Sequence, residues 1–135
     1  PLLLWRWPGT LAFTRLDPWV NFDWGISSPD SSALPADVFS VHWEGQIEPR
    51  YSETYTFSTV ADDGVRLWIN GQLVIGRWAA VQATTEDSGT ITLQAGQRYD
   101  LVLEYFDAGY TANIRLDWAS PSQSREAVPP QCLYP

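Results

Sequence analysis

Short runs of alternating, β-branched and aromatic residues recur along the chain, and no window shows sustained helical periodicity. Gly, Pro, Asn or Ser residues separate these runs, as is typical of turns between strands. The pattern predicts an all-β protein, an antiparallel β-sandwich or barrel with long loops. We expect strands over residues 38–47, 54–60, 65–69, 72–76, 89–93, 98–106 and 112–118.

The pair Asn70-Gly71 lies between two apolar runs and predicts a two-residue type I′ hairpin. Both positions of that turn need a positive φ, which Asn and Gly adopt more readily than other residues. The two runs should therefore pair as antiparallel strands. The two-residue period of a strand places Val65, Leu67 and Ile69 on one face of the first strand.

The charge balance excludes two classes of partner. Eight arginines, no lysine and 16 acidic residues give a net charge of -8, which repels nucleic acid and anionic membrane surfaces.

The apolar opening LLLW is interrupted by Arg6 and Pro8, so we expect neither a signal peptide nor membrane insertion. The lone Cys132 cannot form an internal disulfide.

The chain has the length of one domain. At 135 residues it should bury a single core, and we expect one domain over residues 1–135, taken from a larger multidomain protein. The first 35 residues contain several prolines and are expected to form a loop-rich lead-in, and residues 119–135 an extended tail.

Two adjacent carboxylates, Asp62 and Asp63, precede Gly64 and a predicted strand. In an extended strand their side chains would point to opposite faces, so a shared ligand requires a special backbone. The tripeptide alone is compatible with a solvated turn or with a cation site. A glycosidase acid/base pair does not fit, since such carboxylates need about 5–9 Å between them.

A longer pattern surrounds this tripeptide. The run GQIEPRYSETYTFSTVADDGVRLWINGQLVIGRW, residues 45–78, is flanked by NFDWG at 21–25, LPADVFSVHWEG at 34–45, AGQRYDLVLEYFD at 95–107 and IRLDW at 114–118. In this combination and order the chain resembles the PA14 domain over nearly its whole length. The resemblance implies an antiparallel β-sandwich that occurs as a module of secreted and cell-surface proteins.

The resemblance also implies a Ca²⁺ site. In lectin-like members the two adjacent aspartates are joined by a cis peptide bond and bind Ca²⁺, which binds sugar hydroxyls. Further ligands come from the loop after the long penultimate strand, here Asp107, Ala108 and Gly109. This chain has one glycine in that loop where such members often have two.

Two more residues are candidates for ligand contact. Tyr110 is expected either to stack on a sugar ring or to pack within its loop, and Asn113 either to offer an amide oxygen or to face solvent. Asp107 has the alternative of a surface charge at a strand end. His42, flanked by Val41 and Trp43 in a strand, has no nucleophile pattern beside it and is expected to be structural.

These observations predict a noncatalytic, Ca²⁺-dependent carbohydrate-binding module of an adhesin or lectin type, located outside the cell or on its surface. The expected partners are a monosaccharide or glycan end with a vicinal diol and the other domains of the parent chain. The alternative is a structural or protein-contact module of a secreted enzyme or surface protein, in which any calcium only fixes loops.

Overall fold

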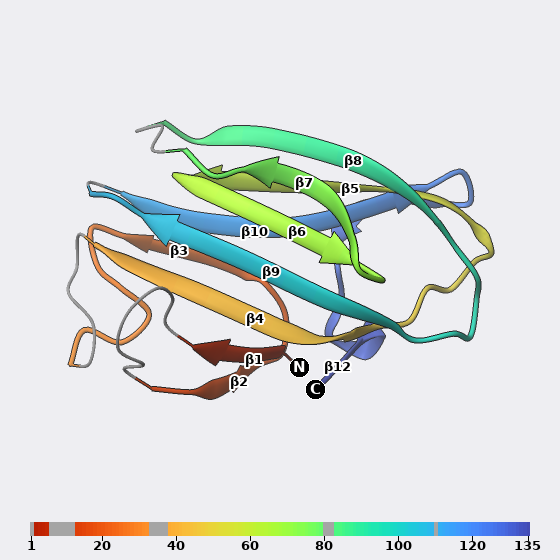
Figure 1. Ribbon diagram of the computed structural model, residues 1–135, viewed down its shortest axis with the longest axis horizontal. Coiled ribbons are helices and arrows are strands. Elements are labelled where there is room, and N and C mark those ends of the chain that lie inside the picture. Colours follow the sequence, from red (N-terminus) through yellow and green to blue (C-terminus); the bar gives the residue numbers. More distant parts are fainter. Residues whose placement is uncertain (1, 6–12, 33–37, 80–82, 110) are drawn as a thin grey trace.

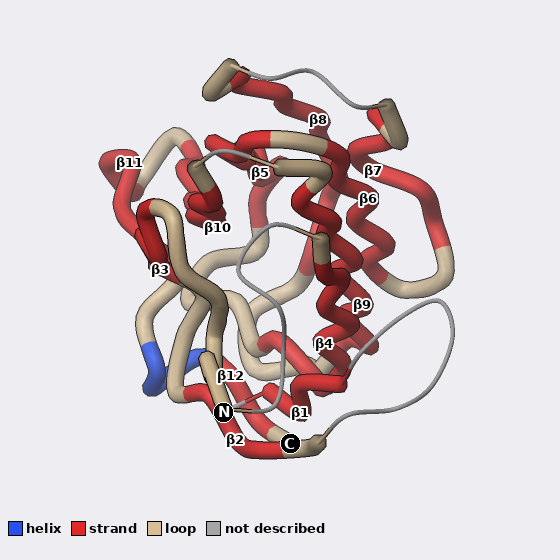
Figure 2. The backbone as a smooth tube through the Cα atoms, turned by 90° about the vertical axis from the view of Figure 1, so that its left-hand side faces the viewer, coloured by secondary structure: helices blue, strands red, loops and turns tan. Residues whose placement is uncertain are grey.

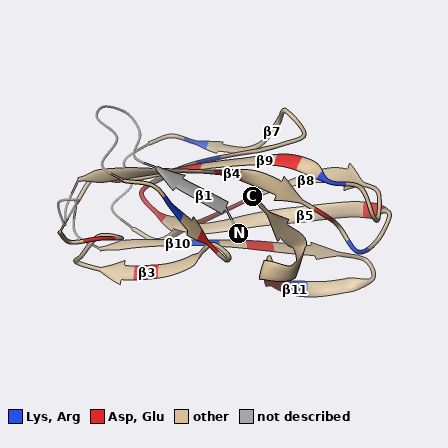
Figure 3. Cartoon of the chain, turned by 90° about the horizontal axis from the view of Figure 1, so that it is seen from below, with Lys and Arg blue, Asp and Glu red and all other residues tan. Residues whose placement is uncertain are grey.

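The computed structural model describes residues 2–5, 13–32, 38–79, 83–109 and 111–135, and of residues 2–5 only the backbone. Two antiparallel sheets pack face to face, as Figures 1 and 3 show. The predicted all-β sandwich is therefore confirmed. The strands are β1 (Leu2–Trp5), β2 (Arg15–Asp17), β3 (Asn21–Gly25), β4 (Phe39–Ile47), β5 (Glu53–Asp62), β6 (Gly64–Ile69), β7 (Gln72–Arg77), β8 (Thr85–Leu93), β9 (Tyr99–Asp107), β10 (Ala112–Ser120), β11 (Gln123–Ala127) and β12 (Leu133–Tyr134).

The first sheet has the strand order β2-β1-β4-β9-β6-β7, with β12 also paired to β4. The second has the order β11-β10-β5-β8, with β3 also paired to β10. The seven predicted strands correspond to β4–β10, which comprise the central strands of both sheets and the edge strands β7 and β8. Their alternating pattern is clear because one face of each is buried between the sheets.

The expected loop-rich lead-in and extended tail are wrong in part. The first 35 residues include β1, β2 and β3, and the tail includes β11, a 3₁₀ turn at Pro130–Cys132 and β12. These strands are short, and β1, β3 and β12 pair with β4 or β10, which lie far away in the sequence. Their stability comes from that pairing, which a local pattern does not reveal.

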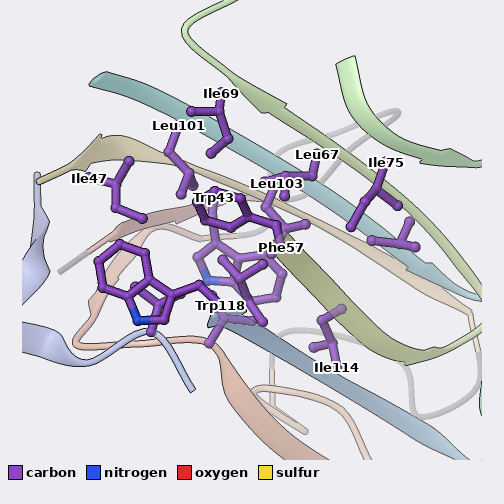
Figure 4. Packing of buried hydrophobic residues seen from close by; sticks show 14 of the residues in the cluster. Trp43, Ile47, Phe57, Leu67, Ile69, Ile75, Leu101, Leu103, Ile114 and Trp118 are labelled. Atoms are coloured by element: carbon purple, nitrogen blue, oxygen red, sulfur yellow. The ribbon is translucent and has the colours of Figure 1, made fainter. Parts of the chain in front are cut away.

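The core fills the space between the sheets (Figure 4). Its largest fully buried side chains are aromatic: Trp43, Trp118, Tyr55, Tyr105 and Phe57. The inward positions predicted for β6 are confirmed, since the side chains of Val65, Leu67 and Ile69 have no exposed surface. Such burial of aromatic and branched side chains supplies the main favourable free energy of folding.

The hairpin turn is also confirmed. Asn70 and Gly71 have φ angles of 51° and 75°. The turn connects β6 to β7, which pair antiparallel. In the part of the chain that the structure describes, no helix has the length and hydrophobicity needed to cross a membrane.

Candidate functional site

The strands β5 and β9 end, and β6 begins, at the same end of the sandwich (Figure 1). Three buried carboxylates belong to these strand ends. Asp62 is the last residue of β5, Asp63 links it to β6, and Asp107 is the last residue of β9. Their exposed fractions are 3%, 0% and 1%. We call these three side chains the carboxylate cluster, and Figure 2 looks onto this end of the molecule.

The Asp62-Asp63 peptide bond is cis, as the resemblance implied. The backbone of this pair is held by β9. The Tyr105 hydroxyl donates a hydrogen bond to the carbonyl oxygen of Asp62. The Asp63 amide donates one to the carbonyl oxygen of Phe106, at 3.4 Å. The aspartate pair is thus tied to the strand that ends in Asp107.

Each carboxylate of the cluster has one satisfied oxygen. Asp62 Oδ2 accepts from the Thr111 hydroxyl at 3.0 Å, Asp63 Oδ2 from the Ala108 amide at 2.7 Å, and Asp107 Oδ1 from the Gly109 amide at 3.3 Å. The second oxygens, Asp62 Oδ1, Asp63 Oδ1 and Asp107 Oδ2, are buried and accept no hydrogen bond from the protein. A buried carboxylate oxygen without a donor is costly, and a cation is one group that satisfies it.

The electrostatics show the same excess of negative charge. The pKa of Asp107 is raised to about 7, mainly by burial and in part by the neighbouring Asp63, against the hydrogen bond from the Gly109 amide. Burial also raises the pKa of Asp62, although the hydrogen bond from Thr111 opposes this shift. Desolvation and like charge both disfavour the ionised form. A bound cation would stabilise the ionised carboxylates and so oppose both effects.

One basic side chain acts on the cluster. Arg77 lowers the pKa of Asp62, but this effect is smaller than those of burial and of Asp63. Arg77 forms an ion pair with Asp87, whose Oδ2 accepts from its Nε at 2.7 Å, while its Nη1 and Nη2 are buried and donate no hydrogen bond to the carboxylates. Arg77 therefore leaves the carboxylate cluster with unbalanced negative charge.

The ring of Phe106 lies against the backbone of Gly64 and leaves no room for a side chain there. A Cβ at residue 64 would lie 2.0 Å from Phe106 Cε1, far inside contact distance. Phe106 is paired with Gly64 across β6 and β9, so its ring covers the backbone next to the aspartate pair. The glycine of Asp-Asp-Gly is thus explained by the close packing of Phe106 against the backbone of β6.

The structure brings most of the predicted site residues together. Ala108 and Gly109 follow Asp107 and donate their amides to the cluster, and Gly109 has a φ of 134°. Asn113 lies opposite Asp62 on β10, but its amide nitrogen donates to Thr84 Oγ1 at 3.2 Å. Tyr110 lies outside the described residues.

Sequence reasoning gave no role to Thr111, whose hydroxyl binds Asp62. Thr111 lies four residues after Asp107 in the same loop, and this position is the feature of the sequence that indicates proximity to the cluster. His42 contacts Glu44 and Glu104, at 3.2 and 3.1 Å, on the outer surface of its sheet. These hydrogen bonds fit the structural role expected of His42.

The chemistry of the cluster suits a hard cation. Within the described residues, no group of three or more Asp, Glu, His or Cys side chains could hold a metal ion by itself. Calcium accepts a mixed set of 6–8 oxygen ligands that includes backbone carbonyls and water. The structure provides the buried, unpaired carboxylate oxygens of the aspartate pair for such a set.

Comparison with known proteins gives a family and several relatives. The family model for the PA14 domain matches residues 7–131. Anti-sigma-I factor RsgI3 of Acetivibrio thermocellus is 50% identical over 123 residues, which are 91% of this chain and 19% of that protein. The chain therefore spans about a fifth of this curated relative.

Solved structures agree on the fold. An anti-sigma factor domain-containing protein has a TM-score of 0.94 at 45% identity, covering 99% of this chain and 47% of the other. A PA14 sugar-binding domain from an RTX adhesin has a TM-score of 0.66 at 24% identity, covering 86% of this chain and 76% of the other. At 24% identity, the similarity to the RTX adhesin domain shows a shared fold and nothing more.

Proposed function

The chain belongs to the PA14 domain family, and from this premise we propose that it is a noncatalytic module that binds carbohydrate through Ca²⁺. The observation that carries the proposal is the set of buried carboxylate oxygens without a donor, on Asp62, Asp63 and Asp107. A purely structural turn has no need for three such oxygens at one end of a sandwich.

The protein groups would hold the ion as follows. Asp62 and Asp63 supply the principal carboxylate oxygens, and Asp107 supplies negative charge beside them. The carbonyl groups of Ala108 and Gly109 supply neutral oxygen ligands, and water completes the set. When bound, the ion offers coordination positions to two adjacent sugar hydroxyls, so the preferred ligand is a sugar with a free vicinal diol.

The relatives support a setting for this activity. The sugar-binding domain of the RTX adhesin has the same fold, which makes carbohydrate the first ligand class to test. The identity of 50% to an anti-sigma factor supports a parent chain of that kind, in which this domain recognises a glycan outside the cell. Its other partners would then be the remaining domains of that parent chain.

A glycan array tests the proposal. In the presence of Ca²⁺, the protein displayed as a multimer should bind sugars with an unsubstituted vicinal diol. In the presence of EDTA, it should not bind them. The double variant Asp62→Ala/Asp63→Ala should be silent in both. Calorimetry on the same sample reports Ca²⁺ binding separately. An array without signal from protein that holds Ca²⁺ would reject the lectin function and favour the structural, protein-contact module.

A further inference from the structure

A hollow of about 320 Å³ adjoins the carboxylate cluster. Its volume lies at the lower end of the range for small-ligand sites, about 300–1,000 Å³. Residues of β9 and its loop, Asp107 and Ala108, belong to both the hollow and the cluster region. The rest of the lining is mainly apolar and includes Val38, Phe39, Trp78 and Phe106. We call this the aromatic hollow.

Two of the three aromatic rings that line the hollow, those of Trp78 and Phe106, are held in place. Trp78 meets Phe106 edge to face, with ring centroids 4.7 Å apart and planes at 67°. The Arg66 guanidinium lies 3.8 Å from the centroid of the Trp78 ring. Arg66 is in turn fixed by Glu104, at 2.8 Å. These contacts orient the rings before any ligand arrives, which lowers the entropy lost on binding.

Part of this wall faces solvent. Trp78 is 36% exposed and Val38 is 62% exposed, although both are large apolar side chains. Large exposed apolar groups gathered at a hollow mark a binding surface more often than isolated ones do. Aromatic rings offer a flat apolar surface, and the C–H face of a pyranose ring is a matching partner.

The aromatic hollow continues directly from the carboxylate cluster. Phe106 connects the two, because its ring covers Gly64 beside the aspartate pair and also lines the hollow. A ligand anchored by its hydroxyls at the cluster would therefore place its attached group toward Phe106 and Trp78. The polar anchor fixes one ring and leaves an apolar surface for the next.

We propose that the aromatic hollow is a second subsite, which binds the ring attached by a glycosidic bond to the sugar held at the carboxylate cluster. This inference rests on the proposed function. It predicts that the module recognises glycosides and oligosaccharides in preference to single monosaccharides. Trp78 and Phe106 would provide that preference, whereas the carboxylate cluster would provide the dependence on Ca²⁺.

The test compares small glycosides that differ only in the attached group. Affinities for the methyl and phenyl glycosides of glucose, galactose and mannose are measured by calorimetry in Ca²⁺. A phenyl ring mimics the flat apolar face of a second sugar. We expect the phenyl form of the sugar that binds to be about 3- to 10-fold tighter than its methyl form, from one aromatic contact.

Two variants remove the subsite, and one serves as a control. Trp78→Ala and, separately, Val38→Asn should bring the phenyl-to-methyl ratio close to one, with Ca²⁺ affinity and methyl glycoside affinity changed less than about twofold. Val38 is so exposed that Val38→Asn should fold even if Trp78→Ala does not. Leu73→Asn, at an exposed position on β7, should leave the ratio unchanged.

The outcomes separate this inference from the function on which it depends. Methyl glycoside binding in Ca²⁺ with no phenyl preference would overturn the subsite and leave the lectin function in place. A phenyl preference that survives both Trp78→Ala and Val38→Asn would also overturn it, since another surface would then be responsible. If none of the six glycosides bound in Ca²⁺, the subsite would be rejected, and the array decides the lectin function independently.

Discussion

At the scale of single residues, the carboxylate cluster is the feature with the most to explain. Buried like charges oppose folding unless something binds them. Asp107 shows this most clearly, because burial raises its pKa to about 7. A protein that keeps such groups at the end of its fold gives up stability in the absence of a ligand. The chain should therefore respond strongly to a cation.

Asp107→Asn tests this cost. The amide has nearly the shape of the carboxylate but no charge, so the variant should melt at or above the temperature of the native chain in EDTA. At a Ca²⁺ concentration 100 times the Kd, the native chain should gain about 2.7 kcal/mol and the variant much less. Calorimetric melting curves measure both effects. Asp100→Asn, at an exposed position of the same strand, should change neither. A variant less stable than the native chain in EDTA would contradict the account.

Gly64→Ala tests the contact with Phe106. The added methyl group collides with the ring, so we expect a loss of about 1–3 kcal/mol, as for other overpacked sites. Because residue 64 directly follows the aspartate pair, Ca²⁺ affinity should fall as well. Urea unfolding and calorimetry measure the two losses.

A second substitution shows whether the ring is the cause. Phe106→Leu in the Gly64→Ala background should recover part of the stability, and a double-mutant cycle gives the coupling between the two positions. Strictly additive effects would mean that the glycine is needed for another reason.

The sequence predicted some of these residues and missed others for a physical reason. The aspartate pair and its cis bond followed from the resemblance to the PA14 domain. The Thr111 hydrogen bond and the Phe106 ring over Gly64 depend on how β9 and its loop lie against β5 and β6. Contacts between residues 42 and 49 positions apart leave no periodic signal in a single sequence.

At the scale of elements, strands were predictable where the local chemistry was sufficient. The β6–β7 hairpin followed from Asn70-Gly71 because its turn type demands particular backbone angles. In contrast, β1 and β3 have few residues and depend on distant partners, β4 and β10. Short strands of this kind need the tertiary structure to form.

Gly71→Ala tests the turn. Gly71 has a φ of 75°, which costs a residue with a Cβ about 1–2 kcal/mol. We expect a loss of about that size in urea unfolding, with unchanged Ca²⁺ affinity, because the turn lies at the far end of β6 from Gly64. Asn70→Gly is the matched control and should stay within about 0.5 kcal/mol of the native chain. Equal stability of Gly71→Ala and the native chain would contradict the assigned turn.

At the scale of the whole molecule, the carboxylate cluster and the last strand lie at opposite ends of β4. Asp107 pairs with Phe39, whereas Tyr134 of β12 pairs with Gln46, seven positions along the strand. At the rise of a β-strand, this separates them by roughly 24 Å. Figure 1 shows the C-terminus away from the end where β9 finishes. A surface attached to β12 would therefore leave the cluster facing outward.

This arrangement predicts how attachment affects binding. The chain biotinylated beyond Pro135 and loaded on streptavidin should stay on a glycan-coated surface in Ca²⁺ far longer than the monomer, because several weak sites act together, a gain of about 10²–10⁴ in avidity. Biotin placed instead at Thr84→Cys, beside Asn113 near the cluster, should abolish most of that gain by blocking access. Surface plasmon resonance measures both, with the Asp62→Ala/Asp63→Ala chain as the blank. Stronger retention through Thr84 than through the C-terminus would place the binding surface elsewhere, since the attached streptavidin would cover the end of the sandwich that carries the carboxylate cluster.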